Sequence, residues 1–275
     1  YHFGSGERTA LFMTWVALFY LKTLLWPDFL SARYPYGDTD SFGVPELAVR
    51  LSPGVLATFD RGAMYRRKNE IVETLAGGVA SMLKAAGVSV FSGSGQLLNA
   101  DAPFQVLVSS ADGAAQTLES QKVMLATGSA PARLPVPGCD NPTVWTSDDL
   151  LGAAGTEPFQ SLLIVGGGVI GAEMASIYRQ LGVEVTIIEA EARCLPMMDT
   201  DLGRSAEAML KARGVTVLTA AKLQNLVQNA DGFTAVYEKN GVSGEVKAQH
   251  ALLATGRSPE TAGLWAANVT LTMNR

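Results

Sequence analysis

The most regular hydrophobic pattern lies in the second half of the chain. Ser161–Val165 is an almost wholly apolar run, which is typical of a strand buried on both faces. Residues 172–181 then carry apolar side chains at helical spacing, and those predicted to face inward are Met174, Ile177 and Tyr178. A second strand is predicted at residues 183–188. This order predicts an α/β unit with parallel strands and covering helices.

The same kind of alternation continues toward residue 257. The elements predicted there are a helix at 202–213, a strand at 215–218, an antiparallel pair at 233–239 and 245–248, and a last strand at 251–253. The fold class predicted from the pattern is therefore α/β.

A long amphipathic helix is predicted ahead of this unit. It starts at Met64 and ends near Gly87, a residue type that commonly closes helices. Its predicted apolar face consists of Ile71, Val72, Leu75, Val79, Met82 and Leu83. Short strands are expected after it at residues 88–91, 104–109 and 122–125. The proline-rich segment 131–142 is expected to cross between two domains.

An apolar segment near the start of the chain allows two interpretations. Residues 10–26 contain a single charge, Lys22, and are followed by a loop-like stretch at 27–60. Seventeen helical residues reach about 25 Å, whereas a bilayer core is about 30 Å thick. We therefore favour a buried helix and keep a membrane segment as the alternative.

Charge and metal-ligand content narrow the function classes. The net charge is −5 with both signs interleaved, and no basic run suggests nucleic acid binding. The two cysteines, Cys139 and Cys194, and the two histidines, His2 and His250, have no metal-site spacing. We predict no metal site and a reducing compartment, either cytoplasm or an organellar matrix.

The candidate chemistry lies in a glycine-rich turn between the first two strands of the α/β unit. In this turn, Gly166 allows a tight bend, Gly168 lets the backbone approach a pyrophosphate, and Gly171 lets the helix pack close to the strand. The free N–H groups at the helix start favour phosphate charge. The context predicts a nucleotide site, and the alternative is a glycine-rich turn without a ligand.

The nucleotide preference is predicted from one acidic residue. Glu189 ends the second strand, 18 positions after Gly171. Its carboxylate can accept hydrogen bonds from a ribose 2′-OH and repels a 2′-phosphate, so NAD is favoured over NADP. The nearby Arg193 lies beyond the strand end and is not expected to reverse this preference. The alternative for Glu189 is a solvated charge at a strand end.

Three segments of the chain resemble a known family. They are LLIVGGGVIGAEMASIYRQLGVEVTIIEAEARCLPMMD, VMLATGSAPARLP and LLATGRSPET. They resemble the flavin-dependent pyridine nucleotide–disulfide oxidoreductases, and within that family the dihydrolipoamide dehydrogenases. The resemblance implies an oxidoreductase that passes electrons from a dithiol through FAD to NAD⁺. The partners it implies are a nicotinamide nucleotide and FAD.

The resemblance also implies a domain order. A Rossmann-like NAD-binding domain at 151–257 is inserted in a partial FAD-binding domain at 1–150, and 258–275 is a truncated return segment. Site residues carried over by motif are Ala126, Thr127 and Gly128 before the insertion, Ala254 and Gly256 after it, and Val169, Ile170 and Glu173 beside the glycine turn. Of these, Val169 lies next to the nicotinamide–flavin contact and Glu173 reaches toward the flavin, where the family pairs it with a lysine.

The departures from the family pattern concern the redox centre. The family's redox disulfide is followed by a lysine, and aligning Lys22 with that lysine puts Met13 and Leu18 at the cysteine positions. In this register Lys22 pairs with Glu173; the alternative is a charge at the end of an apolar helix. The family's N-terminal FAD fingerprint, catalytic histidine and dimerisation domain have no counterpart in this sequence.

Three functions remain open on these grounds. The first is a partial or divergent dihydrolipoamide dehydrogenase-like enzyme that retains FAD. The second is an NAD(H)-binding module without turnover. The third is a membrane-anchored flavoprotein of the NADH dehydrogenase type, anchored through residues 10–26. A family-type homodimer is doubtful, and whether a second chain completes the site is left open.

Overall fold

A computed structural model describes residues 60–272, and these residues fall into two compact units. Pro131–Gly256 makes up most of the first unit, together with the start of the long helix, up to Lys68. Asn69–Ala130 and the residues after Gly256 make up the second. The apolar segment 10–26, which includes Lys22, and residues 27–59 of the expected loop lie outside the described residues.

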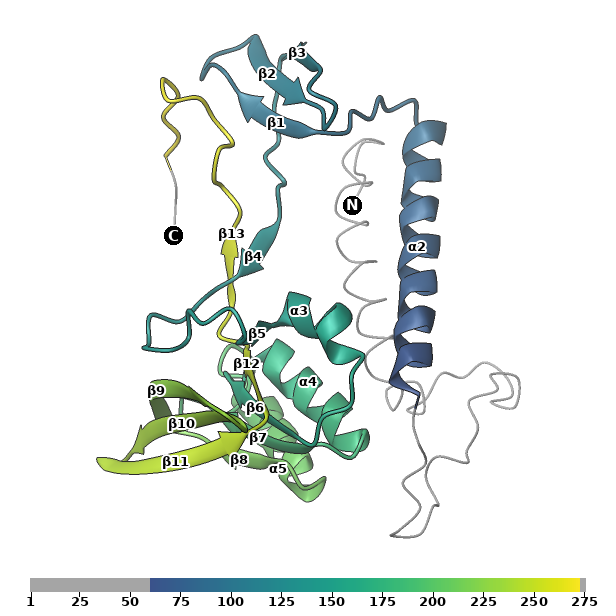
Figure 1. Ribbon diagram of the computed structural model, residues 1–275. Coiled ribbons are helices and arrows are strands. Elements are labelled where there is room, and N and C mark those ends of the chain that lie inside the picture. Colours follow the sequence, from purple (N-terminus) through teal and green to yellow (C-terminus); the bar gives the residue numbers. More distant parts are fainter. Residues whose placement is uncertain (1–59, 273–275) are drawn as a thin grey trace. The chain divides into compact units, whose positions relative to one another are not determined.

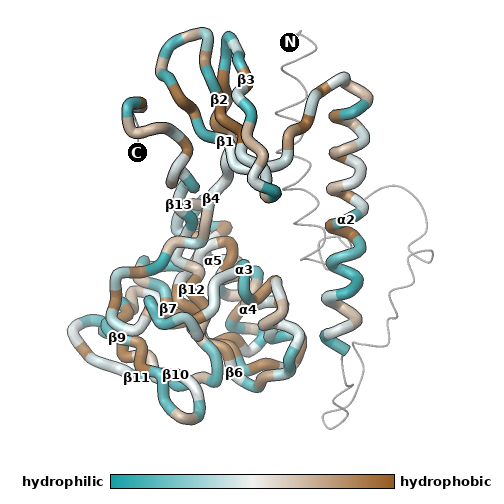
Figure 2. The backbone as a smooth tube through the Cα atoms, turned by 45° about the horizontal axis from the view of Figure 1, so that its top comes forward, coloured by the Kyte–Doolittle hydropathy of each residue, from teal (hydrophilic) through white to brown (hydrophobic). Residues whose placement is uncertain are grey.

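The first unit is organised around a five-stranded parallel sheet. Its strands are β5 (Trp145–Thr146), β6 (Ser161–Val165), β7 (Glu184–Ile188), β8 (Thr216–Leu218) and β12 (His250–Leu253). They lie in the order β5-β12-β6-β7-β8, and every neighbouring pair is parallel. The apolar colour concentrates on β6 and β12, as Figure 2 shows. The predicted parallel α/β architecture is confirmed.

Helices cover one face of this sheet (Figure 1). They are α3 (Ser147–Leu151), α4 (Val169–Gln180) and α5 (Thr200–Ala212), and a short 3-10 turn, η4 (Ala153–Gly155), follows α3. On α4, Met174 and Tyr178 are buried and Ile177 packs against the same core, as its spacing predicted. The sheet contributes Leu162, Ile164, Val185, Ile187 and Leu252 to this core.

An antiparallel meander covers the opposite face (Figure 1). It consists of β9 (Ala221–Asn229), β10 (Gly232–Lys239) and β11 (Val242–Ala248), in the order β11-β10-β9. Its inward side chains meet the sheet in a second core, formed by residues such as Leu223, Leu226, Phe233, Leu163 and Ile188. The central strands are thus buried on both faces, which explains their continuous apolar sequences.

The second unit contains two small sheets. An antiparallel meander is formed by β1 (Ser94–Leu97), β2 (Phe104–Ser109) and β3 (Ala115–Ser120). The short strands β4 (Ser129–Pro131) and β13 (Arg257–Pro259) pair with each other where the chain passes to and from the first unit. At this passage the Ala132 amide donates to the Gly256 carbonyl over 3.0 Å.

The long helix α2 (Arg61–Ala85) starts three residues before its predicted first residue. Its first turns pack into the first unit through Arg61, whose guanidinium lies 4.5 Å from the Phe159 ring centroid, and through Tyr65. The Tyr65 hydroxyl bonds to the Leu150 carbonyl and to the Tyr178 hydroxyl. The predicted apolar face is only partly covered, since Val72 remains 51% exposed. Among the described residues, no helix has the length and apolarity to cross a membrane.

Several predicted elements differ from the structure. Residues 88–91 and 122–125 form no strand, and the strand expected at 88–91 lies instead at β1, where its edge pairs with β2. The strands β3 and β9 were not predicted, and β11 begins three residues earlier than expected. The strand prediction for 88–91 was wrong because Val90 faces solvent, 67% exposed, with no sheet to cover it.

Candidate nucleotide-binding site

The glycine turn follows β6 at the carboxyl edge of the parallel sheet. Gly166 has φ +107°, a backbone conformation that favours glycine, and its amide donates to the Ile188 carbonyl over 2.8 Å. A Cβ on Gly171 would lie 1.9 Å from the Gly166 carbonyl oxygen and 3.3 Å from the Ile164 Cγ2. Only a glycine at position 171 therefore lets α4 approach β6 this closely.

Gly168, in the same turn, has open space in its side-chain direction, unlike Gly171. It is the residue that caps the N-terminus of α4, and its side-chain direction meets nothing within 4 Å. No side chain caps the α4 N-terminus, so the dipole and the N–H groups of the first turn face this open space. Backbone N–H groups at an uncapped helix start are a common site for phosphate groups.

Glu189 lies against the glycine turn. It immediately follows β7, its exposed fraction is 7%, and one carboxylate oxygen accepts from the Gly167 amide over 2.5 Å. The other oxygen accepts from the Glu191 amide over 2.7 Å. These two bonds fix the carboxylate at the edge of the turn, and each oxygen keeps a further lone pair for another donor. The fold thus brings together the two features on which the nucleotide prediction depends.

The segment after Glu189 forms a wall beside the turn that the sequence did not predict. The Leu195 amide donates to the Gly167 carbonyl over 2.8 Å. A Cβ on Gly167 would lie 3.0 Å from the Cys194 sulfur and 3.2 Å from the Glu189 Cβ. The sequence of this segment, Arg-Cys-Leu-Pro, has no periodic hydrophobic pattern. Nothing in the sequence therefore indicated that it lies beside the turn.

The second Ala-Thr-Gly motif lies beside the turn as well. Ala254 follows β12, and its amide donates to the Val165 carbonyl over 2.8 Å. A Cβ on Gly166 would lie 2.4 Å from the Ala254 carbonyl oxygen. Gly256 has φ +120° and an open side-chain direction. Two motifs that are far apart in sequence therefore meet at one edge of the sheet, where open α/β sheets bind ligands.

The first Ala-Thr-Gly motif belongs to the second unit. Ala126, Thr127 and Gly128 lie in an exposed, irregular segment before β4. The Thr127 hydroxyl donates to the Glu260 carbonyl over 2.7 Å, and the Glu260 amide donates to the Gly128 carbonyl over 3.1 Å. These two hydrogen bonds connect this motif to the residue that follows the return strand β13.

The remaining expected site residues lie on the first turns of α4. Val169 is 42% exposed at the helix start, whereas Ile170 packs against the core. Glu173 follows one turn later and is half-buried. Its expected partner, Lys22, lies outside the described residues, so the pairing of Lys22 with Glu173 stays a prediction.

Neither cysteine is placed for redox chemistry. Cys139 and Cys194 are both free thiols with an exposed fraction of 0%. Burial raises the pKa of the Cys194 thiol to about 11, with the negative charges of Glu207 and Glu189 adding to the effect. A buried thiol that stays protonated is a poor nucleophile. Within residues 60–272, no group of three or more His, Cys, Asp or Glu side chains is arranged to hold a metal ion.

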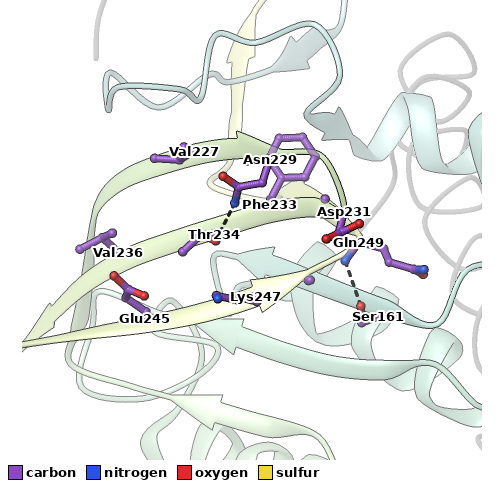
Figure 3. Close-up of a pocket in the computed structure, with 12 residues that line it drawn as sticks. Ser161, Val227, Asn229, Asp231, Phe233, Thr234, Val236, Glu245, Lys247 and Gln249 are labelled. Carbon is purple, nitrogen blue, oxygen red and sulfur yellow. Dashed lines mark hydrogen bonds between the residues drawn. The ribbon is translucent and has the colours of Figure 1, made fainter.

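A separate groove of about 550 Å³ lies on the outer face of the β9–β11 meander (Figure 3). Its lining includes Thr234, Lys247 and Glu245, and it reaches Ser161 and Gln249. Ser161 begins β6 and Gln249 precedes β12, so this groove lies at the amino ends of the parallel strands. The glycine turn follows their carboxyl ends. The groove is therefore distinct from the candidate nucleotide site.

Comparison with known proteins gives consistent results. Residues 37–275 match the sequence model of the pyridine nucleotide-disulphide oxidoreductases. A dihydrolipoyl dehydrogenase from Bacillus subtilis is 33% identical over 82% of this chain and 47% of its own length. One from Zymomonas mobilis is 35% identical over 72% of this chain and 42% of its own length. The chain thus spans about half the length of these relatives.

Solved structures show the same relationship. The crystal structure of LpdA from Mycobacterium tuberculosis matches with a TM-score of 0.65 and 27% identity, covering 74% of this chain and 44% of LpdA. The flavoprotein disulfide reductase RclA from Escherichia coli matches with a TM-score of 0.61 and 27% identity, covering 74% of this chain and 44% of RclA. From the matched family model and these relatives, we conclude that the chain belongs to the pyridine nucleotide-disulphide oxidoreductase family.

Proposed function

We propose that the first unit binds NAD(H) at the glycine turn, as the nicotinamide nucleotide site of a flavin-dependent oxidoreductase. The observation that carries the proposal is the contrast within one turn. Gly171 is a glycine because α4 leaves no room for a side chain, whereas Gly168 faces open space at the start of that helix. Packing therefore explains the first glycine but not the second, and a phosphate group at the helix N-terminus explains it.

The preference for NAD(H) over NADP(H) rests on Glu189. Its carboxylate is fixed beside the turn by the Gly167 and Glu191 amides. An anion held there accepts hydrogen bonds from a ribose 2′-OH and repels a 2′-phosphate. Gly166, Val169 and Ile170 complete the proposed wall around the nucleotide. When bound, NAD⁺ accepts a hydride and NADH supplies one.

The flavin part of the proposal rests on family membership. Relatives of this chain are dihydrolipoyl dehydrogenases, and a similar solved structure is a flavoprotein disulfide reductase. We propose that Glu173 and the second Ala-Thr-Gly motif, both in the first unit, belong to the flavin side of the site, and that the complete protein oxidises a dihydrolipoyl-type dithiol. We further propose that it works in the cytoplasm or an organellar matrix.

A second candidate is a nucleotide-binding module that carries out no disulfide chemistry. The observation that favours it is the state of the thiols. Cys139 and Cys194 are the two cysteines of the 275-residue chain, and both are buried and unpaired. A dithiol–disulfide exchange within this chain has no accessible pair of thiols.

Titration of the 275-residue chain with NADH and NADPH tests the nucleotide proposal. We expect NADH to bind more tightly. Glu189→Gln is expected to weaken NADH binding by about tenfold, because a charge-assisted hydrogen bond to the ribose is lost, and to lessen the discrimination against NADPH. Glu191→Gln is the matched control, since the Glu191 side chain is exposed. Tighter binding of NADPH by the wild type would refute the assignment of Glu189.

The absorption spectrum separates the two candidate functions. A flavoprotein purifies with a visible flavin band that NADH bleaches in the absence of oxygen. A colourless protein that binds NADH without any NADH–dye reductase activity would support the binding module and contradict the enzyme.

A further inference from the structure

Arg193 makes an unusual set of contacts beside the proposed nucleotide site. It lies four positions beyond Glu189, in the segment that leads from β7 to α5. Its guanidinium donates to three main-chain carbonyls of the residues that follow it. The acceptors are Leu195 over 2.8 Å, Pro196 over 3.1 Å and Met198 over 3.0 Å. A single side chain thus ties together the segment 194–198.

This segment carries backbone strain. Leu195 has φ +51°, in the left-handed region that non-glycine residues rarely adopt. Such a conformation is unfavourable and persists only where surrounding contacts fix it. The Arg193 guanidinium holds the Leu195 carbonyl itself and two carbonyls after it. The charge-assisted bonds from Arg193 therefore hold the strained residue in place.

The strained residue is the one that contacts the glycine turn. The Leu195 amide donates to the Gly167 carbonyl over 2.8 Å. The Cys194 sulfur packs beside Gly167, and the Gly167 amide in turn donates to Glu189. A continuous set of contacts therefore runs from Arg193 through Leu195 and Gly167 to Glu189.

The first turn of α5 packs closely against the Arg193 guanidinium. A Cβ on Gly203 would lie 2.8 Å from the Arg193 Nη1 and 2.7 Å from the Cys194 carbonyl oxygen. The position of the arginine thus depends on the absence of a side chain at position 203.

We infer that Arg193 is a positioning residue for the nucleotide, an inference that rests on the proposed NAD(H) site. It acts by fixing the segment 194–198, which sets the orientation of Gly167 and Glu189. The opposite role, direct binding of a 2′-phosphate, requires a guanidinium whose donors point away from the protein. Here three of the five guanidinium N–H donors are directed at carbonyls of the protein's own chain.

The two roles predict different behaviour of Arg193→Lys. A lysine supplies the same charge to a phosphate, but its compact ammonium cannot span three carbonyls. We expect Arg193→Lys and Arg193→Ala to weaken NADH and NADPH by the same factor, about tenfold. Ethylguanidine added to Arg193→Ala is expected to restore part of the NADH affinity, and ethylamine is not. Arg204→Ala is the matched control, because Arg204 is an exposed cation paired only loosely with Asp201 over 3.8 Å.

Three results would overturn the positioning role. They are wild-type NADH affinity in Arg193→Ala, full retention of affinity in Arg193→Lys, and a loss confined to NADPH. Gly203→Ala provides a second route, since its Cβ presses on both the guanidinium and the Cys194 carbonyl while Arg193 itself is kept. We expect it to weaken both nucleotides as well.

Hydrogen exchange without nucleotide separates this inference from the proposed function. Arg193→Ala is expected to speed exchange of the Leu195 and Gly167 amides, because their bonds depend on the fixed segment. Unchanged exchange would refute the positioning contacts themselves. A wild-type chain that binds no NADH, with exchange that still depends on Arg193, would instead refute the nucleotide site and the nucleotide part of this inference.

Discussion

Two glycines three residues apart are expected to respond in opposite ways to an added side chain. The substitutions are Gly171→Ala, which adds one methyl group, and Gly168→Val, which adds three carbons. The smaller change is predicted to damage folding and the larger one to damage nucleotide binding. The comparison tests the interpretation of the turn directly, because both variants alter the same loop.

The magnitudes follow from what each side chain meets. A methyl on Gly171 lies 1.9 Å from the Gly166 carbonyl oxygen, so α4 must move away from β6. Overpacking typically costs about 1–3 kcal/mol, and a clash with the main chain belongs at the upper end, about 3 kcal/mol. At about 2–4 °C per kcal/mol, the melting temperature falls by about 6–12 °C. A Cβ on Gly168 meets nothing within 4 Å, its φ of −68° lies in a region open to valine, and a poorer cap costs about 1 kcal/mol.

The assay pairs thermal unfolding, followed by circular dichroism, with NADH titration of both variants. We expect Gly168→Val to melt within about 4 °C of the wild type and to lose most NADH affinity. Gly77→Val, at an open position on α2, controls for the bulk of the new side chain. Equal melting temperatures for the two turn variants, or wild-type NADH affinity in Gly168→Val, would refute the reasoning.

Three further predictions concern the interior of the first unit. Tyr65→Phe removes the hydroxyl that bonds to both Leu150 and Tyr178, so we expect a loss of about 1–3 kcal/mol in urea unfolding, more than for Tyr178→Phe. Burial lowers the pKa of His250 below its usual 6.5, so the folded state binds its proton less readily than the unfolded state. Stability is therefore lost as pH falls through 6.5, and His250→Gln is expected to reduce the difference in unfolding free energy measured between about pH 7 and pH 5. Cys194 is expected to resist iodoacetamide at about pH 8 until denaturant is added, because its buried thiol has a pKa of about 11; labelling of the native protein would contradict this.

The parallel sheet was predictable because a strand that is buried on both faces has an apolar sequence without polar alternation. Ser161–Val165 is an almost wholly apolar segment and forms a central strand, whereas the apolar residues of Glu184–Ile188 are preceded by Glu184 and interrupted by Thr186. The sequence of β9 has no such apolar pattern. Its inward residues Leu223 and Leu226 are three apart, because the register with β10 shifts between Val236 and Tyr237. A bulge of this kind breaks the period of two on which strand prediction depends.

The candidate site was predictable where a residue type has a local cause. The positive φ of Gly166 favours glycine, and the close approach of α4 to β6 leaves no room for a side chain at Gly171. Both requirements are local, so the glycine motif itself predicted the turn. The roles of Leu195 and Arg193 depend on contacts made only after folding, and nothing in their spacing indicates them. The amide–carboxylate bond between Gly167 and Glu189 was likewise beyond sequence reasoning, although Glu189 was a predicted site residue.

The hydrogen bond between Ala132 and Gly256 places the entry and exit of the first unit side by side. When the two ends of a segment lie side by side, the segment can be inserted or removed as one piece. The rest of the chain then has only a short gap to close. Excision and separate expression of residues 131–256 would have to keep the start of α2 as well, because Arg61 and Tyr65 pack into this unit. The same geometry makes this unit a candidate for transplantation into loops of unrelated scaffolds.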